Sequence, residues 1–181
     1  MNLDKIKSDA DEKIRELKDP ESIRTPGRTW TRYPEEFNLE ASQVETDIET
    51  EGDVEVFRGE EALKEAGKKA FDLIKTDEDR LTAIHTANLD TLIYVEASRE
   101  SEIHVKHRSD GKISSHIVLE AKKNSSVTLT EETESNEFNT SFTEIYVREN
   151  ASVEYGAVEK PQNFSYSRRK AITEKYGKIN W

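Results

Sequence analysis

Apolar side chains near the N-terminus recur every three to four residues, which is the period of one face of a helix. Between Asn2 and Lys18 these positions are Leu3, Ile6, Ala10, Ile14 and Leu17. The pattern predicts an amphipathic helix with a narrow apolar stripe. Asp19-Pro20 should end this helix, because proline cannot continue the backbone hydrogen-bond ladder.

Residues 21–53 show no sustained periodicity and predict a loop-rich connector with a short strand at most. The aromatic residues Trp30, Tyr33 and Phe37 are expected to anchor it. From Val54 to Phe57 the side chains alternate as in a strand.

Two more helices are predicted before the pattern changes. The first spans Glu60 to Lys75, and the second, shorter helix spans Asp79 to Ala87. After Asp90 the apolar period becomes two, which indicates β-strands nearly to the end of the chain. We therefore divide the chain into an N-terminal helix with its connector (1–58), a helical cap (59–89) and a β core (90–181).

Three stretches of the β core look alike: IYVEASRESEIHV from Ile93, IVLEAKKNSSVTL from Ile117 and IYVRENASVEY from Ile145. Each has a strand, a polar corner and a second strand, and the starts are 24 and 28 residues apart. We align the second strands at Ile103, Val127 and Val153. Two short strands per repeat of this length are typical of a β-solenoid.

The solenoid prediction identifies which residues should form the core. It should have three to four coils, capped at its N-terminal end by the helix Glu60 to Lys75. The alternative is an antiparallel hairpin meander with a turn at Ser109-Asp110-Gly111. The expected core positions are Ile93, Val95, Ile103, Val105, Ile117, Leu119, Val127, Leu129, Ile145, Val147 and Val153.

Composition narrows the classes of function. The net charge of −11 argues against a nucleic-acid binder, because such proteins neutralise phosphates with basic side chains. Only 33% of the residues are hydrophobic, which a solenoid tolerates because it buries one residue of each alternating pair. The chain has no cysteine, which excludes disulfides, thiolate nucleophiles and cluster ligation by its own thiols. We find no signal peptide or membrane segment and expect a cytoplasmic protein.

Four parts of the chain carry a further pattern. They are residues 79–87, DRLTAIHTA, after a helix, the corners in residues 117–129 and 144–155, the aromatic segment TWTRY from Thr29 and the last residues 178–181. Together they resemble the SufB/SufD family of iron–sulfur cluster assembly scaffolds, although His85 stands where asparagine is usual in that family. The resemblance implies a right-handed parallel β-helix that pairs with a sister scaffold subunit, or with a second copy, and works with the SufC ATPase. It implies no ATPase site, and the chain has no Gly-x4-Gly-Lys-Ser/Thr loop.

Members of that family are considerably longer, and the residues proposed for cluster chemistry lie in their C-terminal part. No catalytic, cofactor-binding or metal-binding residue is therefore carried over, and we expect a cluster only in an assembled complex. The sequence does not distinguish a fragment from a split or a minimal homologue.

The remaining candidate residues have ordinary interpretations. His104 and His107 should point to opposite faces of a strand, His116 has no required partner, and His85 should be a helix-to-core contact. Carboxylate pairs such as Glu131-Glu132 and Glu35-Glu36 diverge in a strand, which argues against a carbohydrate-active enzyme. The basic cluster at residues 168–170 is expected to form local ion pairs.

The last coil is where we expect a partner. Ile172, Ile179 and Trp181 should form or border an exposed apolar edge that a partner completes. The preferred interpretation is a non-catalytic scaffold subunit for iron–sulfur assembly, and the alternative is a structural β-solenoid with an unrelated protein partner.

Overall fold

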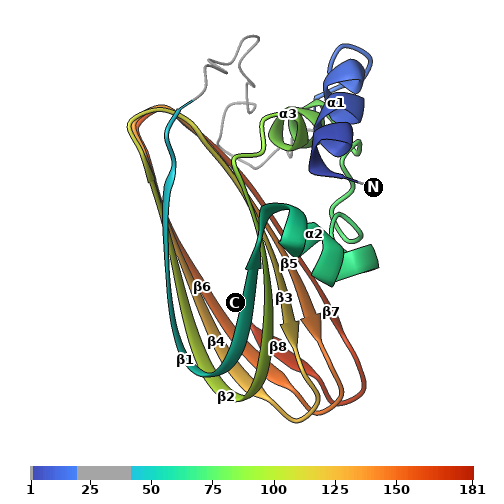
Figure 1. The fold of residues 1–181 in the computed structure, drawn as a ribbon, viewed down its shortest axis with the longest axis vertical. Coiled ribbons are helices and arrows are strands. Elements are labelled where there is room, and N and C mark those ends of the chain that lie inside the picture. The colour runs from blue at the N-terminus through green and yellow to red at the C-terminus, as the bar shows by residue number, and fades with distance from the viewer. Residues whose placement is uncertain (1, 20–41) are drawn as a thin grey trace, which may run out of the picture.

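A computed structural model describes residues 2–19 and 42–181 (Figure 1). The predicted helix end at Pro20 and the aromatic anchors Trp30, Tyr33 and Phe37 lie outside these residues. The helices are α1 (Leu3–Lys13), α2 (Gly59–Ala66), a 3₁₀ turn (Gly67–Lys69) and α3 (Arg80–Ala87). The strands are β1 (Glu45–Arg58), β2 (Thr91–Ser109), β3 (Ile113–Ala121), β4 (Ser126–Ser135), β5 (Phe138–Val147), β6 (Ser152–Pro161), β7 (Phe164–Thr173) and β8 (Lys178–Asn180).

Residues 91–180 form a parallel β-solenoid of about three turns. The first half of β2 pairs in parallel with β3, and the second half pairs in parallel with β4. The stacking continues through β3, β5 and β7 on one side and through β4, β6 and β8 on the other. Ile93 pairs with Ile117, as the solenoid predicts, and the meander alternative is wrong.

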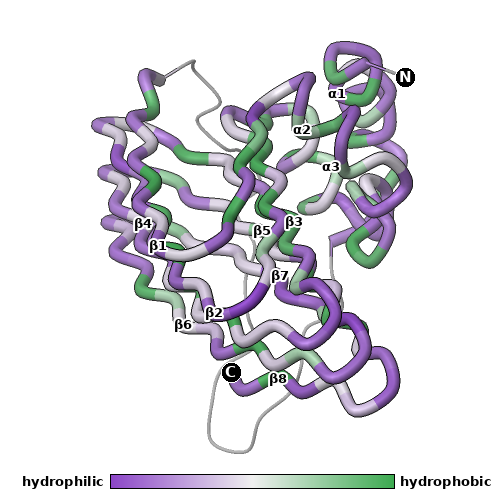
Figure 2. The backbone as a smooth tube through the Cα atoms, turned by 60° about the horizontal axis from the view of Figure 1, so that its bottom comes forward, coloured by the Kyte–Doolittle hydropathy of each residue, from purple (hydrophilic) through white to green (hydrophobic). Residues whose placement is uncertain are grey.

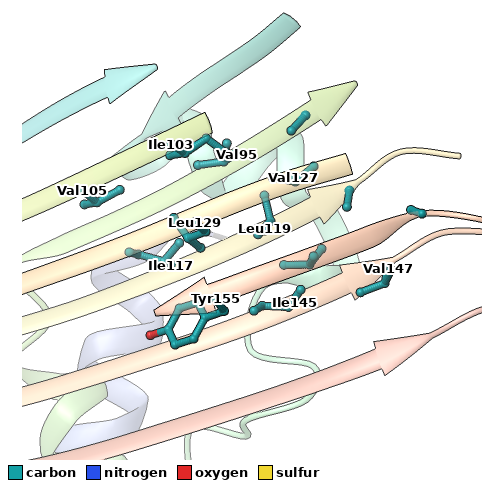
Figure 3. Close-up of a cluster of buried hydrophobic side chains, with 14 of the residues drawn as sticks. Val95, Ile103, Val105, Ile117, Leu119, Val127, Leu129, Ile145, Val147 and Tyr155 are labelled. Carbon is teal, nitrogen blue, oxygen red and sulfur yellow. The ribbon is translucent and has the colours of Figure 1, made fainter. Parts of the chain in front are cut away.

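The interior of the solenoid is the main hydrophobic core, and all eleven predicted core residues are buried in it (Figure 3). Hydrophilic residues predominate along the corners of the coils (Figure 2). Because only inward residues need to be apolar, the low hydrophobic content is enough for this fold.

The predicted alignment of the coils was wrong by two residues in places. Ile103 pairs with Leu129 rather than Val127, and Ile145 pairs with Leu119 rather than Ile117. The corner between Ala121 and Ser126 is two residues longer than the corner between Ala97 and Glu100, which shifts the later register. A shift of two keeps every side chain on the same face, so the core prediction was unaffected.

Strand β1, and not the predicted helix, caps the first coil. It pairs antiparallel with both halves of β2, and its register shifts at Gly52, where β2 turns its corner. Its inward residues Ile48, Val54 and Val56 pack against the core. The predicted connector was wrong over residues 45–53, which belong to β1, because glutamate, aspartate and threonine fill most other positions of this strand and hide its alternation.

The predicted helix Glu60 to Lys75 is also shorter than expected. It ends at Ala66, because Gly67 has a φ of 57° and its N–H bonds back to Leu63, as at a glycine-terminated helix end. The helix α2 covers an outer face of the solenoid rather than its end. It belongs to a second buried cluster with Leu92, Tyr94, Val118 and Tyr146.

The other two helices complete a layer beside β3, β5 and β7 (Figure 1). The helix α1 is shorter than predicted and buries Ile6 and Ala10. The predicted third helix is confirmed as α3, with Asp79 as its N-cap and a capping box to Thr82. None of the helices in the described ranges is long and apolar enough to cross a membrane.

Candidate functional site

The last coil carries the three residues predicted to face a partner, but it places them on two faces. Ile172 of β7 is 52% exposed and is paired with Tyr146, on the outer side of the sheet. Ile179 of β8 packs partly against the interior core. Trp181 is 56% exposed, and its ring lies edge-on to Tyr155 at 5.3 Å between centroids. The structure brings Ile179 and Trp181 together, while Ile172 stands apart.

The edge of this coil also contains an aromatic residue that the sequence analysis missed. Tyr176 has a φ of 61° and is 68% exposed. It occupies the corner position that Asn124 and Asn150 hold in the coils before it, also with positive φ. These asparagines bond to each other, with Asn150 Nδ2 donating to Asn124 Oδ1 at 3.1 Å. Asparagine tolerates this backbone conformation and a bulky aromatic residue does not, so Tyr176 is an outlier of the kind found at functional sites.

A buried carboxylate lies inside the solenoid behind this edge. Glu131 of β4 is 1% exposed and accepts a hydrogen bond from Tyr155 Oη at 2.7 Å and one from Thr143 Oγ1 at 3.0 Å. Ser141 Oγ also donates to it. Three hydroxyl donors thus solvate a carboxylate in the interior of the protein.

The same hydrogen-bond network continues to the last coil. Arg169 Nε donates to Tyr155 Oη at 2.7 Å, and the same guanidinium pairs with Glu159. Burial alone would raise the pKa of Glu159, but hydrogen bonds from Ser165, Ser167 and Arg169 lower it. The polar network therefore runs from the second coil to the open side of the last one.

The residues that form the solenoid are also those that match a known family. The family model described as SUF system FeS cluster assembly, SufBD core domain, matches residues 90–181, just over half of the chain. The chain belongs to the SufBD family. Members of this family are generally non-catalytic scaffold components of the SUF system. No curated protein and no solved structure matches the chain significantly.

The histidines of this SufBD-family chain behave largely as structural residues. His104 and His107 point to opposite faces, as predicted, and His107 Nδ1 lies 3.0 Å from Thr46 Oγ1 inside the solenoid. His85 contacts the core under α3, also as predicted. His116 Nε2 lies 2.8 Å from Glu144 Oε1, a buried pairing that the sequence did not indicate.

The acidic and basic clusters of the SufBD chain form ion pairs and hydrogen bonds within the protein. Glu132 points outward to Lys106 and Lys160, whereas its neighbour Glu131 points inward, so this pair does diverge. Arg168 and Lys170 pair with Glu78 on the outer side, and Arg169 points inward. The expectation of local ion pairs is confirmed.

An iron–sulfur cluster would need a set of ligands that the described part of this SufBD-family chain does not assemble. The sequence has no cysteine, and the described residues contain no group of three or more His, Cys, Asp or Glu side chains that could hold a metal ion. The hydroxyl-lined Glu131 site offers one carboxylate only. The residues present therefore do not fit a cluster held by this chain alone.

Proposed function

We propose that this chain is a non-catalytic scaffold subunit of a SUF-type iron–sulfur cluster assembly complex. The family match over the whole solenoid is the observation that carries the proposal. In this role the chain pairs with a sister SufB/SufD-type subunit and works with a SufC-type ATPase. The cluster is cargo of the assembled complex, held by ligands that other subunits supply.

The last coil is the surface that we assign to the sister subunit. Within residues 42–181, no strand pairs with the outer edges of β7 and β8. Edges of this kind readily accept a further strand. The exposed Ile172, Tyr176 and Trp181 border these backbone edges and would supply apolar contacts.

Charge favours a different subunit over a second copy at this edge. Residues 164–181 contain five basic side chains and one acidic side chain, although the whole chain has a net charge of −11. Lys175 and Lys178 are exposed there. Two copies joined edge to edge would bring these lysines together, whereas an acidic partner edge would be attracted to them.

Replacing Tyr176 by asparagine should separate binding from folding. Asparagine suits the positive φ, so the thermal stability of the chain should stay the same or rise slightly. Loss of an exposed aromatic anchor should weaken binding to a sister subunit about tenfold. Binding is measured by titration calorimetry, and stability by thermal unfolding.

The matched control for Tyr176 is Val158→Thr, which changes an exposed apolar residue on the outer face of β6. This control should bind normally. If Tyr176→Asn bound as tightly as the native chain, the corner at Tyr176 would not be part of the interface. Failure to bind any SufB/SufD-type subunit or any SufC-type ATPase would instead favour a structural solenoid with an unrelated partner.

The isolated chain should neither hydrolyse ATP nor retain a cluster after anaerobic reconstitution with iron and sulfide. It lacks a phosphate-binding loop, and its ligands for iron are dispersed. Iron and sulfide are quantified after desalting, and phosphate release is followed with Mg-ATP. A brown species with stoichiometric iron and sulfide would contradict the proposed division of labour.

A further inference from the structure

A fully buried histidine joins the helix α3 to the outer face of the solenoid. The ring of His85 is stacked on Phe142 with 3.7 Å between centroids, and its Nδ1 lies 2.9 Å from Thr140 Oγ1. Thr140 Oγ1 in turn donates to Ser114 Oγ at 2.9 Å, so Thr140 accepts its bond from His85. His85 is therefore the Nδ1–H tautomer, and its Nε2 carries a bare lone pair with no partner.

Among the residues that the structure describes, none accepts a hydrogen bond at Nε2. The ring of His116, on β3, is a neighbouring titratable group, with 5.6 Å between the ring centroids. Of the carboxylates in residues 2–19 and 42–181, Glu144 of β5 alone is bonded to this pair, and its oxygens are occupied by His116 and by the backbone amides of residues 71–73. On β7, Tyr166 and Arg168 are bonded to each other and to Asp79 at the start of α3.

Protonation of His85 is consequently opposed while α3 is docked. A charged Nε2–H would lie in an apolar environment without an acceptor, beside a second imidazole. Burial lowers the pKa of His85 well below its usual value, and the neighbouring His116 lowers it further. In an undocked helix the ring would meet water and titrate near its ordinary value of about 6.5.

We propose that residues 71–87, which comprise the turn held by Glu144 and the helix α3, are a pH-sensitive layer that undocks from the solenoid when His85 takes up a proton. The folded-state pKa is the depressed one, so docking is fully favourable above about pH 6.5 and weakens as the pH falls below it. Undocking would uncover Phe142 on the outer face of β5.

Undocking would also break contacts between this layer and the last coil. Lys170 of β7 donates to Leu73 O at 2.7 Å, and Arg168 pairs with Glu78 and Asp79. Release of the layer would free these two cations beside the β7 edge. Only this consequence for partner binding depends on the proposed function; the undocking itself does not.

Hydrogen exchange of the isolated full-length chain between pH 7.5 and 5.0 tests the layer. Rates are corrected for the intrinsic pH dependence of exchange. Protection of peptides that cover residues 71–87 should be nearly constant above pH 7 and fall about 30-fold between pH 7.5 and 5.0, since each pH unit well below the free pKa changes the opening constant about tenfold. Peptides from the core strands β3 and β4 should keep their protection.

Two variants test whether the pH dependence of protection comes from the His85 ring. His85→Phe keeps an aromatic ring on Phe142 and should abolish the pH dependence, whereas His104→Gln, which changes a histidine outside this contact, should leave it intact. Constant protection in the native chain, an equal loss in β3 and β4, or a pH dependence that persists in His85→Phe would each overturn the proposal. If His85→Phe does not fold, NMR titration of the native His85 ring decides, since titration near pH 6.5 with α3 still protected would also overturn it.

Discussion

Glu144→Leu should lower the free energy of unfolding by about 4 kcal/mol. Glu144 is fully buried, and its oxygens accept bonds from the backbone N–H groups of Phe71, Asp72 and Leu73 at 2.8, 3.1 and 2.7 Å. His116 Nε2 completes the set at 2.8 Å. Leucine fills the volume but leaves four donors without an acceptor. Urea denaturation followed by circular dichroism measures the loss.

The matched control is Glu154→Leu on the exposed outer face of β6, which should change the stability by less than about 0.5 kcal/mol. Glu144→Gln should fall between the two, because its one carbonyl oxygen can still accept. A Glu144→Leu variant as stable as the control would mean that the turn at residues 71–73 finds other acceptors. The positive φ of Phe71, 59°, would then be maintained without this carboxylate.

The part of the fold that sequence could predict is the part governed by alternation. In residues 91–155 apolar side chains recur at alternate, inward positions of each strand, so periodicity alone identified the buried face, although other inward positions carry polar residues. Pairing partners such as Ile103 and Leu129 were not predictable, because corners of unequal length shift the register without changing that face. The family resemblance pointed to the same architecture, and the family match over residues 90–181 agrees with it.

The buried carboxylates could not be predicted from alternation. Glu131 and Glu144 lie in segments that read as ordinary polar strand positions, and burial of a carboxylate is unusual. Their donors come from residues 10 to 73 positions away. Only the stacking of coils and the docking of the helical layer bring such groups together. The clearest signal in the sequence was the row of Ser, Thr and Asn in β5, which offers hydroxyl and amide donors to an acceptor.

Gly52→Ala should cost about 3 kcal/mol of unfolding free energy and loosen the cap on the first coil. Gly52 has a φ of +92°, and a Cβ placed there would lie 2.3 Å from the carbonyl oxygen of Glu100 and 3.0 Å from Ser101 Cα. Both obstacles are backbone atoms of β2, so no rotamer change relieves them. The register shift of β1 at this residue lets the strand follow β2 around its corner, and alanine would push the two strands apart.

Two other glycines separate the steric part of this loss of stability from the conformational part. Gly59 has a φ of +58° with nothing within 4 Å, so Gly59→Ala should lose only the conformational part, about 1 kcal/mol. Gly156 has an ordinary φ and open space, so Gly156→Ala should be neutral or slightly stabilising. Chemical denaturation of the three variants should rank them Gly52, Gly59, Gly156 in decreasing cost. If Gly52→Ala costs no more than Gly59→Ala, the contact with β2 must be able to open, and β1 would be a looser cap than its pairing along both halves of β2 indicates.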